Sequence, residues 1–122
     1  MANPVVHWEF WSEDPNRCGE FYANVFGWET REIPGMDYKL VDKGADCGIG
    51  GGIMKPQQGP WPAKLTMYID VDDLDAYGEK VRKAGGKLIV EKMAVPNVGM
   101  FTLFEDPDGR VLGMWKQEMP QG

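Results

Sequence analysis

The chain is short of histidine, cysteine and long apolar runs, and each shortage excludes a class of protein. Its 122 residues include one histidine, His7, and two cysteines, Cys18 and Cys47. The cysteines form no CxxC pair and lie beside no cluster of histidines, which argues against a disulfide framework and a zinc site. No apolar run approaches the roughly 20 residues that cross a bilayer, and the N-terminus carries no targeting pattern. We therefore expect a cytoplasmic protein outside the membrane.

Basic residues are also few. Thirteen Lys and Arg stand against nineteen Asp and Glu, and the formal net charge is −6. An acidic surface repels phosphate backbones, which argues against a nucleic-acid-binding protein. A chain of this length with 43% hydrophobic residues can bury one core, so we expect a single compact domain over residues 1–122.

Glycines and prolines divide the chain into short apolar segments. Period-two alternation predicts a strand over Val5–Trp11. Asp14 followed by Pro15 predicts the start of an amphipathic helix that ends near Gly27. Three short β-prone segments follow, at about residues 28–33, 38–42 and 47–54. The first half therefore has the pattern βαβββ.

The second half repeats this order after a Pro/Gly-rich link over residues 55–62. It predicts a strand over 64–70, a helix over 74–84 and strands over 87–90, 99–105 and 111–116, with a turn at residues 106–109 (DPDG). A shift of 59 positions places Asp14 on Asp73 and Gly27 on Gly86. We therefore expect an internal duplication, with module one at about 4–57 and module two at about 61–118.

Four features carry a resemblance to a known family. They are His7 seven residues before the capping Asp14, and residues 21–28 (FYANVFGW), 68–76 (YIDVDDLDA) and 106–109 (DPDG). The chain resembles the vicinal oxygen chelate superfamily, also called the glyoxalase/bleomycin resistance/dioxygenase superfamily, and within it the small glyoxalase-like proteins. The resemblance implies an α+β fold in which the curved mixed sheets of two βαβββ modules surround a cavity. It also implies a homodimer.

Alternation along each module's first strand predicts which side chains face that cavity. In the first module they are His7, Glu9 and Trp11, and in its repeat they are Thr66, Tyr68 and Asp70. The opposite faces are apolar enough to pack beneath the helices, and they consist of Val6, Trp8, Phe10, Leu65, Met67 and Ile69.

The resemblance also implies where a metal ligand would lie, since metal-dependent members take one ligand from the first and one from the last strand of each module. His7 keeps such a position, whereas Thr66 and Gly113 occupy two others and residues 48–54 contain no ligand side chain. A catalytic metal usually needs about three protein ligands, so we expect no metal or other cofactor. The alternative is a rebuilt site around His7 and Glu9, with Glu105 or Asp106 reaching inward, that holds Zn, Ni, Mn or Fe.

Glu9 and Tyr68 are the candidate catalytic pair, because a carboxylate on a cavity face can act as a general base and a phenol can donate a proton. Five residues are candidates for ligand binding: His7, Trp11, Thr66, Tyr68 and Trp115. Trp61 is a further candidate aromatic wall. For each, the alternative is an ordinary core or hydrogen-bonding role. The acidic run at residues 72–75 indicates a helix cap rather than a calcium loop.

The sequence leaves three functions open, and the vacant ligand positions favour the first of them. The first is a protein that binds a small apolar or aromatic molecule in a metal-free cavity. The second is a lyase, isomerase or dioxygenase of the vicinal oxygen chelate type, with a metal or with acid/base chemistry. The third is an interaction module whose own side chains fill the cavity. No docking motif in the sequence names a ligand.

Overall fold

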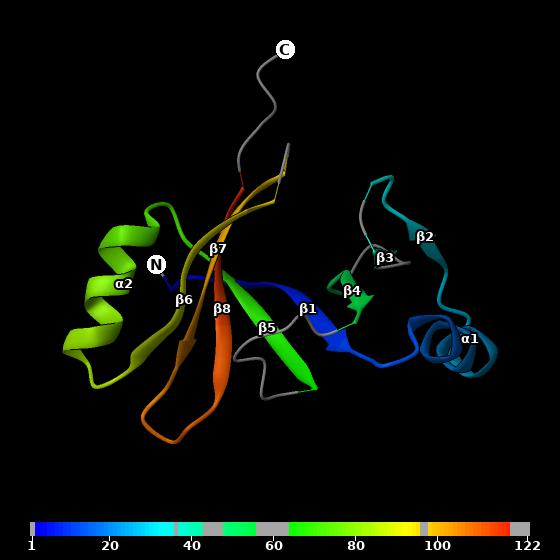
Figure 1. Cartoon of the computed structure of the whole chain (residues 1–122), viewed down its shortest axis with the longest axis horizontal. Coiled ribbons are helices and arrows are strands. Elements are labelled where there is room, and N and C mark those ends of the chain that lie inside the picture. The colour runs from blue at the N-terminus through cyan, green and yellow to red at the C-terminus, as the bar shows by residue number, and fades with distance from the viewer. Residues whose placement is uncertain (1, 36, 43–47, 56–63, 96–97, 118–122) are drawn as a thin grey trace, which may run out of the picture. The chain divides into compact units, whose positions relative to one another are not determined.

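The computed structural model describes residues 2–35, 37–42, 48–55, 64–95 and 98–117. Its elements follow the order βαβββ twice, as the sequence predicts (Figure 1). The first five are β1 (Val5–Trp11), α1 (Pro15–Phe26), β2 (Thr30–Glu32), β3 (Tyr38–Val41) and β4 (Gly51–Met54). The second five are β5 (Leu65–Asp70), α2 (Leu74–Lys83), β6 (Lys87–Val95), β7 (Gly99–Glu105) and β8 (Val111–Gln117).

The chain divides into two compact units, which we describe separately. The first unit holds Val6–Thr66, and the second holds the residues up to Val5 and those from Met67 onward. In the first unit, the strands follow the order β2-β3-β4-β1, with β1 and β4 parallel and the other pairs antiparallel. In the second, the order is β5-β8-β7-β6, with β5 and β8 parallel and the other pairs antiparallel. Each unit therefore contains a mixed sheet, as expected.

Aromatic side chains form the helix-facing core of the first unit. Trp8 and Phe10 of β1 meet Tyr22 of α1 and Trp28, which follows that helix. The ring centroids of Trp8 and Trp28 lie 5.0 Å apart, and those of Tyr22 and Trp28 lie 4.7 Å apart. Phe10 lies 5.3 Å from Tyr22. Contacts among these partly buried rings join α1 to this sheet.

The second unit has an aliphatic core beneath α2. Val71, Leu74 and Met114 are buried, and five partly buried side chains pack against them: Ile69, Tyr77, Val81, Met100 and Phe104. Leu74 lies at the first position of α2, so this core anchors the N-terminal end of the helix.

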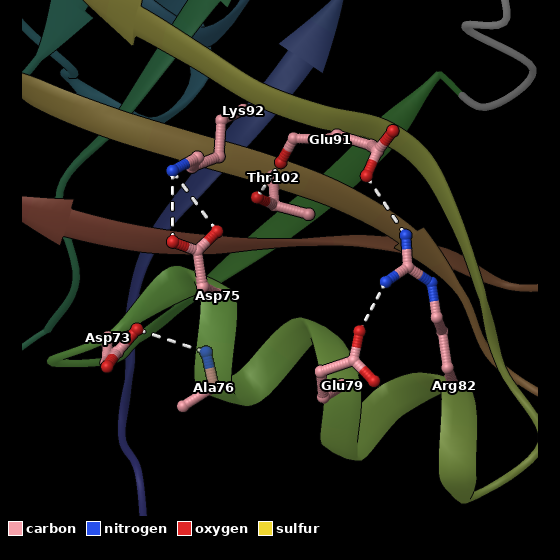
Figure 2. Close-up of polar contacts among 8 residues, drawn as sticks. All are labelled: Asp73, Asp75, Ala76, Glu79, Arg82, Glu91, Lys92 and Thr102. Atoms are coloured by element: carbon pink, nitrogen blue, oxygen red, sulfur yellow. Dashed lines mark hydrogen bonds and ion pairs between the residues drawn. The ribbon is translucent and has the colours of Figure 1, made fainter.

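Ion pairs join the exposed side of α2 to β6 (Figure 2). Arg82 lies 2.6 Å from Glu79 in its own helix and 3.0 Å from Glu91 on β6, and Lys92 lies 3.1 Å from Asp75. Because all of these groups are solvent-exposed, each pair contributes little stability alone. The pairs do, however, give Glu91 and Lys92 partners on α2, so β6 can continue through these charged residues.

Both helices begin with an aspartate cap. The Asp14 carboxylate accepts a hydrogen bond from the Arg17 backbone N–H, and the Asp73 carboxylate accepts one from the Ala76 N–H. The capping role expected within residues 72–75 is therefore confirmed. Among the described residues, no helix is long and apolar enough to cross a membrane.

The structure corrects two expectations. Strand β6 continues to Val95 instead of ending at residue 90, because Glu91 and Lys92 lie on an edge strand where charged side chains are tolerated. Val6, Leu65 and Met67 are not packed beneath the helices as expected, because their side chains are exposed to solvent. Their exposed fractions are 40%, 50% and 41%.

An added methyl group should have opposite effects on stability at two glycines of the first unit. A Cβ atom on Gly51 would lie 2.1 Å from the Trp8 indole, whereas one on Gly19 within α1 would make ordinary contacts at 3.8 Å. We expect Gly51→Ala to lower the free energy of unfolding by roughly 1–3 kcal/mol through overpacking. Gly19→Ala should raise it by up to about 1 kcal/mol through helix propensity. Urea unfolding of both variants measures this, and equal effects would contradict the packing described here.

Candidate functional site

Four polar and aromatic side chains meet on the sheet face of the first unit that lies opposite its aromatic core. His7, Glu9 and Trp11 alternate along β1, and Tyr38 joins them from β3. The Tyr38 hydroxyl donates to Glu9 Oε2 at 2.9 Å and lies 2.7 Å from His7 Nε2. The Trp11 indole N–H donates to Glu9 Oε1 at 2.6 Å. The predicted shared face of His7, Glu9 and Trp11 is thus visible in these contacts.

Glu9 lies at the centre of this polar cluster. Its exposed fraction is 5%, equal to that of Trp11. Burying a carboxylate is costly unless donors compensate for the lost water, and here each carboxylate oxygen accepts a hydrogen bond from a neighbouring ring. Glu9 is therefore held in one orientation by groups on both sides of it.

His7 is partly buried at the edge of the cluster. Burial lowers the pKa of its imidazole below the ordinary value, because the charged form loses hydration. At neutral pH the ring is therefore uncharged, and it acts as a hydrogen-bonding group rather than as a cation.

Glycine at position 52 allows Tyr38 to reach this cluster. In the register of β4, Gly52 lies between Glu9 of β1 and Leu40 of β3. A Cβ atom on Gly52 would lie 1.9 Å from the Tyr38 hydroxyl oxygen and 2.0 Å from Cζ. Any larger residue at position 52 would displace the ring from its place over the strand.

Predicted site residues of the second unit form an aromatic face on that unit's own sheet. Tyr68 is buried over Gly113, its register partner, and packs edge-on against Phe101 at 5.9 Å between ring centroids. Trp115 is half-buried and pairs with Phe101 across β7 and β8. This face is apolar, whereas the corresponding face of the first unit is polar.

The remaining candidates have other surroundings. Thr66, predicted to bind ligand, lies two residues before Tyr68 on β5 and is buried, with 2% of its surface exposed. Asp106, considered as an inward-reaching ligand, instead holds Arg110 at 2.9 Å in the β7–β8 turn. Cys18 is a partly buried thiol whose pKa is raised by burial. Trp61 and Cys47 lie outside the described residues.

Tyr38 is the member of the cluster that the sequence interpretation missed. The sequence feature that could have pointed to Tyr38 is the glycine run before Ile53, which indicates that another group approaches β4 closely. Identifying that group as Tyr38 requires the pairing of β3 with β4, and the register between short strands cannot be read from a single sequence.

The residues of the cluster do not fit a metal site of the kind the family uses. Within the part of the chain that the structure describes, no group of three or more His, Cys, Asp or Glu side chains could hold an ion. His7 and Glu9 are two ligand-type groups, and the Tyr38 hydroxyl lies within hydrogen-bond distance of both. A catalytic divalent ion usually takes about three protein ligands.

Comparison with known proteins identifies the family. Residues 5–113 match the model of the Glyoxalase/Bleomycin resistance protein/Dioxygenase superfamily. The chain belongs to this superfamily. The match covers both βαβββ units, so the resemblance inferred from His7 and the three sequence strings is confirmed.

Individual relatives extend this result. CFP32 of Mycobacterium bovis, provisionally named a glyoxylase, is 33% identical over 88% of this chain and 42% of its own length. The anthracycline biosynthesis protein DnrV of Streptomyces peucetius is 31% identical over 91% of this chain and 46% of its own. The chain therefore spans less than half the length of these relatives.

The solved structures support the fold. A member of the same superfamily from Vibrio splendidus 12B01 superposes with a TM-score of 0.66 at 19% identity, covering 94% of this chain and 99% of the other. At this identity the likeness shows the glyoxalase-like fold alone.

The partly buried imidazole of His7 predicts how the free energy of unfolding depends on pH. Because the folded pKa of His7 is lowered, the unfolded chain takes up the proton first as the pH falls below about 6.5. The free energy of unfolding should therefore decrease in that interval, with a slope of at most about 1.4 kcal/mol per pH unit from this group. Urea unfolding between about pH 8 and about pH 5 measures it.

The matched variant is His7→Gln, which removes the only histidine and leaves every carboxylate in place. We expect a shallower pH dependence above about pH 5.5, where carboxylates contribute least. The same slope in both proteins would show that His7 is not buried in its neutral form.

Proposed function

We propose that this protein binds a small aromatic or apolar molecule that carries a hydrogen-bond donor, without a metal ion, at the His7–Glu9–Trp11–Tyr38 cluster of its first unit. The observation that carries the proposal is the buried Glu9 carboxylate held between the Trp11 indole and the Tyr38 hydroxyl. A fixed acceptor beside an aromatic wall suits a ligand hydroxyl or amide on a planar ring.

One relative supports an aromatic ligand, since DnrV is named for anthracycline biosynthesis. The second unit has an aromatic face of its own, on which Phe101 contacts Tyr68 and pairs with Trp115. Thr66, Tyr68 and Trp115 stay proposed as ligand-binding residues, as His7 and Trp11 do, and the test below addresses the first unit's cluster alone.

The metal-free form of the proposal is supported by the chemistry of the cluster. A hydroxyl already links the imidazole and the carboxylate that would have to converge on an ion, and two such ligands fall short of a stable site. The polar cluster is satisfied by hydrogen bonds alone.

A second candidate function is an isomerase or lyase that uses acid/base chemistry. Glu9 is its base, because a buried and oriented carboxylate can remove a proton beside a carbonyl group. The observation that favours it is the hydroxyl of Tyr38 within 2.9 Å of that carboxylate. Tyr68, the donor expected from the sequence, lies in the second unit. Substrate turnover separates this enzyme from a binding protein.

The binding test uses a dihydroxyanthraquinone as probe, because it is planar and carries hydroxyl donors. We expect calorimetry to show saturable binding to protein treated with a chelator. Glu9→Ala should weaken it roughly tenfold or more, as expected for a lost hydrogen bond to a charged group. Glu20→Ala is the matched control, since Glu20 is an exposed glutamate of α1, and it should bind like the wild type.

The same preparation tests the metal. Elemental analysis and calorimetric titration with Zn²⁺, Ni²⁺, Mn²⁺ and Fe²⁺ should show no stoichiometric uptake. One equivalent of metal, lost in both His7→Ala and Glu9→Ala, would sink the metal-free proposal and favour a metal-dependent lyase or dioxygenase. If Glu9→Ala unfolds, Glu9→Gln keeps the side-chain volume and allows the comparison.

We also propose that the protein is cytoplasmic and forms a homodimer. Two copies would supply about as much chain as one molecule of CFP32 or DnrV. Sedimentation equilibrium at micromolar concentration should give twice the 13.7 kDa chain mass. A single-chain mass would contradict the dimer.

A further inference from the structure

We propose that Tyr38 is the positioning residue of the candidate site: its hydroxyl places the proton of His7 on Nε2 and holds the Glu9 carboxylate as an oriented acceptor. This inference deepens the proposed function and depends on it for its role in binding. The arrangement of protons can be tested without any ligand.

The position of Tyr38 indicates a role beyond packing within its own strand. Tyr38 begins β3, and β4 separates that strand from β1. Adjacent strands lie about 4.8 Å apart, so β3 and β1 are nearly 10 Å apart across the sheet. The tyrosine side chain spans this gap to place its hydroxyl 2.9 Å from Glu9 and 2.7 Å from His7. Few side chains are long enough to do so.

The crossing also constrains the strand beneath it. Gly52 is the register partner of Glu9, and a Cβ atom there would overlap the Tyr38 hydroxyl at 1.9 Å. Gly52 is buried and its φ angle is not positive, so its backbone conformation does not require glycine. What requires glycine at this position is the space taken by the Tyr38 ring.

The hydrogen bonds then determine where the protons lie. A phenol has one proton, and that of Tyr38 is donated to Glu9 Oε2. The contact of 2.7 Å with His7 Nε2 must therefore use a proton on the imidazole, with the tyrosine oxygen as acceptor. A neutral His7 in this arrangement is the Nε2–H tautomer, and its Nδ1 atom is an acceptor.

This arrangement matters for ligand recognition, because it determines which polar groups of the cluster donate hydrogen bonds and which accept them. The carboxylate of Glu9 accepts, and both of its oxygens are oriented by donors from Tyr38 and Trp11. Without the Tyr38 hydroxyl, Glu9 loses one of those donors and His7 loses the acceptor that selects its tautomer. Trp11 would still donate to Glu9 Oε1, but Oε2 and the His7 ring would lose the contact with Tyr38 that orients them.

The test uses the fact that His7 is the chain's only histidine. A long-range ¹H–¹⁵N correlation spectrum of the labelled protein at mildly alkaline pH therefore shows one imidazole. We expect the wild type to show the Nε2–H pattern. Tyr38→Phe keeps the ring and removes the hydroxyl, and it should shift the spectrum toward a mixture of tautomers.

Two further variants make the comparison sharp. Gly52→Ala should change the His7 spectrum in the same direction by displacing the Tyr38 ring. Tyr22→Phe removes a hydroxyl from the opposite, helix-facing side of the same unit and should leave the spectrum unchanged. Thermal unfolding of each variant confirms that it is folded, and if Gly52→Ala is not, Tyr38→Phe alone decides.

The outcomes distinguish this inference from the proposed function. An Nδ1–H pattern in the wild type, or an unchanged spectrum in Tyr38→Phe, overturns the role of Tyr38. A changed spectrum supports it, and Tyr38→Phe should then bind the dihydroxyanthraquinone several-fold more weakly than the wild type. If Tyr38→Phe changes the His7 spectrum but the wild type binds no probe, the proton arrangement is supported and the proposed binding function is overturned.

Discussion

The buried carboxylate of Glu9 is the constraint on which the candidate site depends. A charge out of contact with water must be met by donors, and the indole of Trp11 and the phenol of Tyr38 meet it from two strands. This requirement explains the glycine at position 52, the long reach of Tyr38 and the contact of that hydroxyl with His7. A larger residue at position 52, or a residue other than tyrosine at position 38, would leave the Glu9 carboxylate with fewer hydrogen-bond donors.

The two units use one scaffold for different chemistry. Glu9 pairs in register with Gly52, and Tyr68 pairs in register with Gly113, so each unit has a glycine beside the middle of its first strand. In both units an aromatic ring covers that glycine, Tyr38 in the first and Tyr68 in the second. The first unit therefore presents a carboxylate at this place, and the second presents an aromatic ring.

The same comparison bears on two glycines in strands where the family resemblance implies metal ligands. A side chain at Gly113 would start 2.3 Å from the Tyr68 ring, so a ligand there would require that ring to move. At Gly52 a Cβ atom would overlap Tyr38. Each glycine leaves the space that its tyrosine ring occupies, so a larger side chain at Gly52 or Gly113 would displace that ring.

The sequence by itself determined the order of elements, the aspartate caps, the family and the side of β1 on which His7, Glu9 and Trp11 lie. These features depend on local propensity, on period-two alternation and on short motifs, all of which can be read along the chain. The course of β6 beyond residue 90 escaped such reading, since Glu91 and Lys92 interrupt the apolar pattern and find their partners on α2. The meeting of Tyr38 with Glu9 and His7 was decided only by the tertiary structure. It requires the register of three strands and the space above Gly52, and neither is a property of neighbouring residues in the chain.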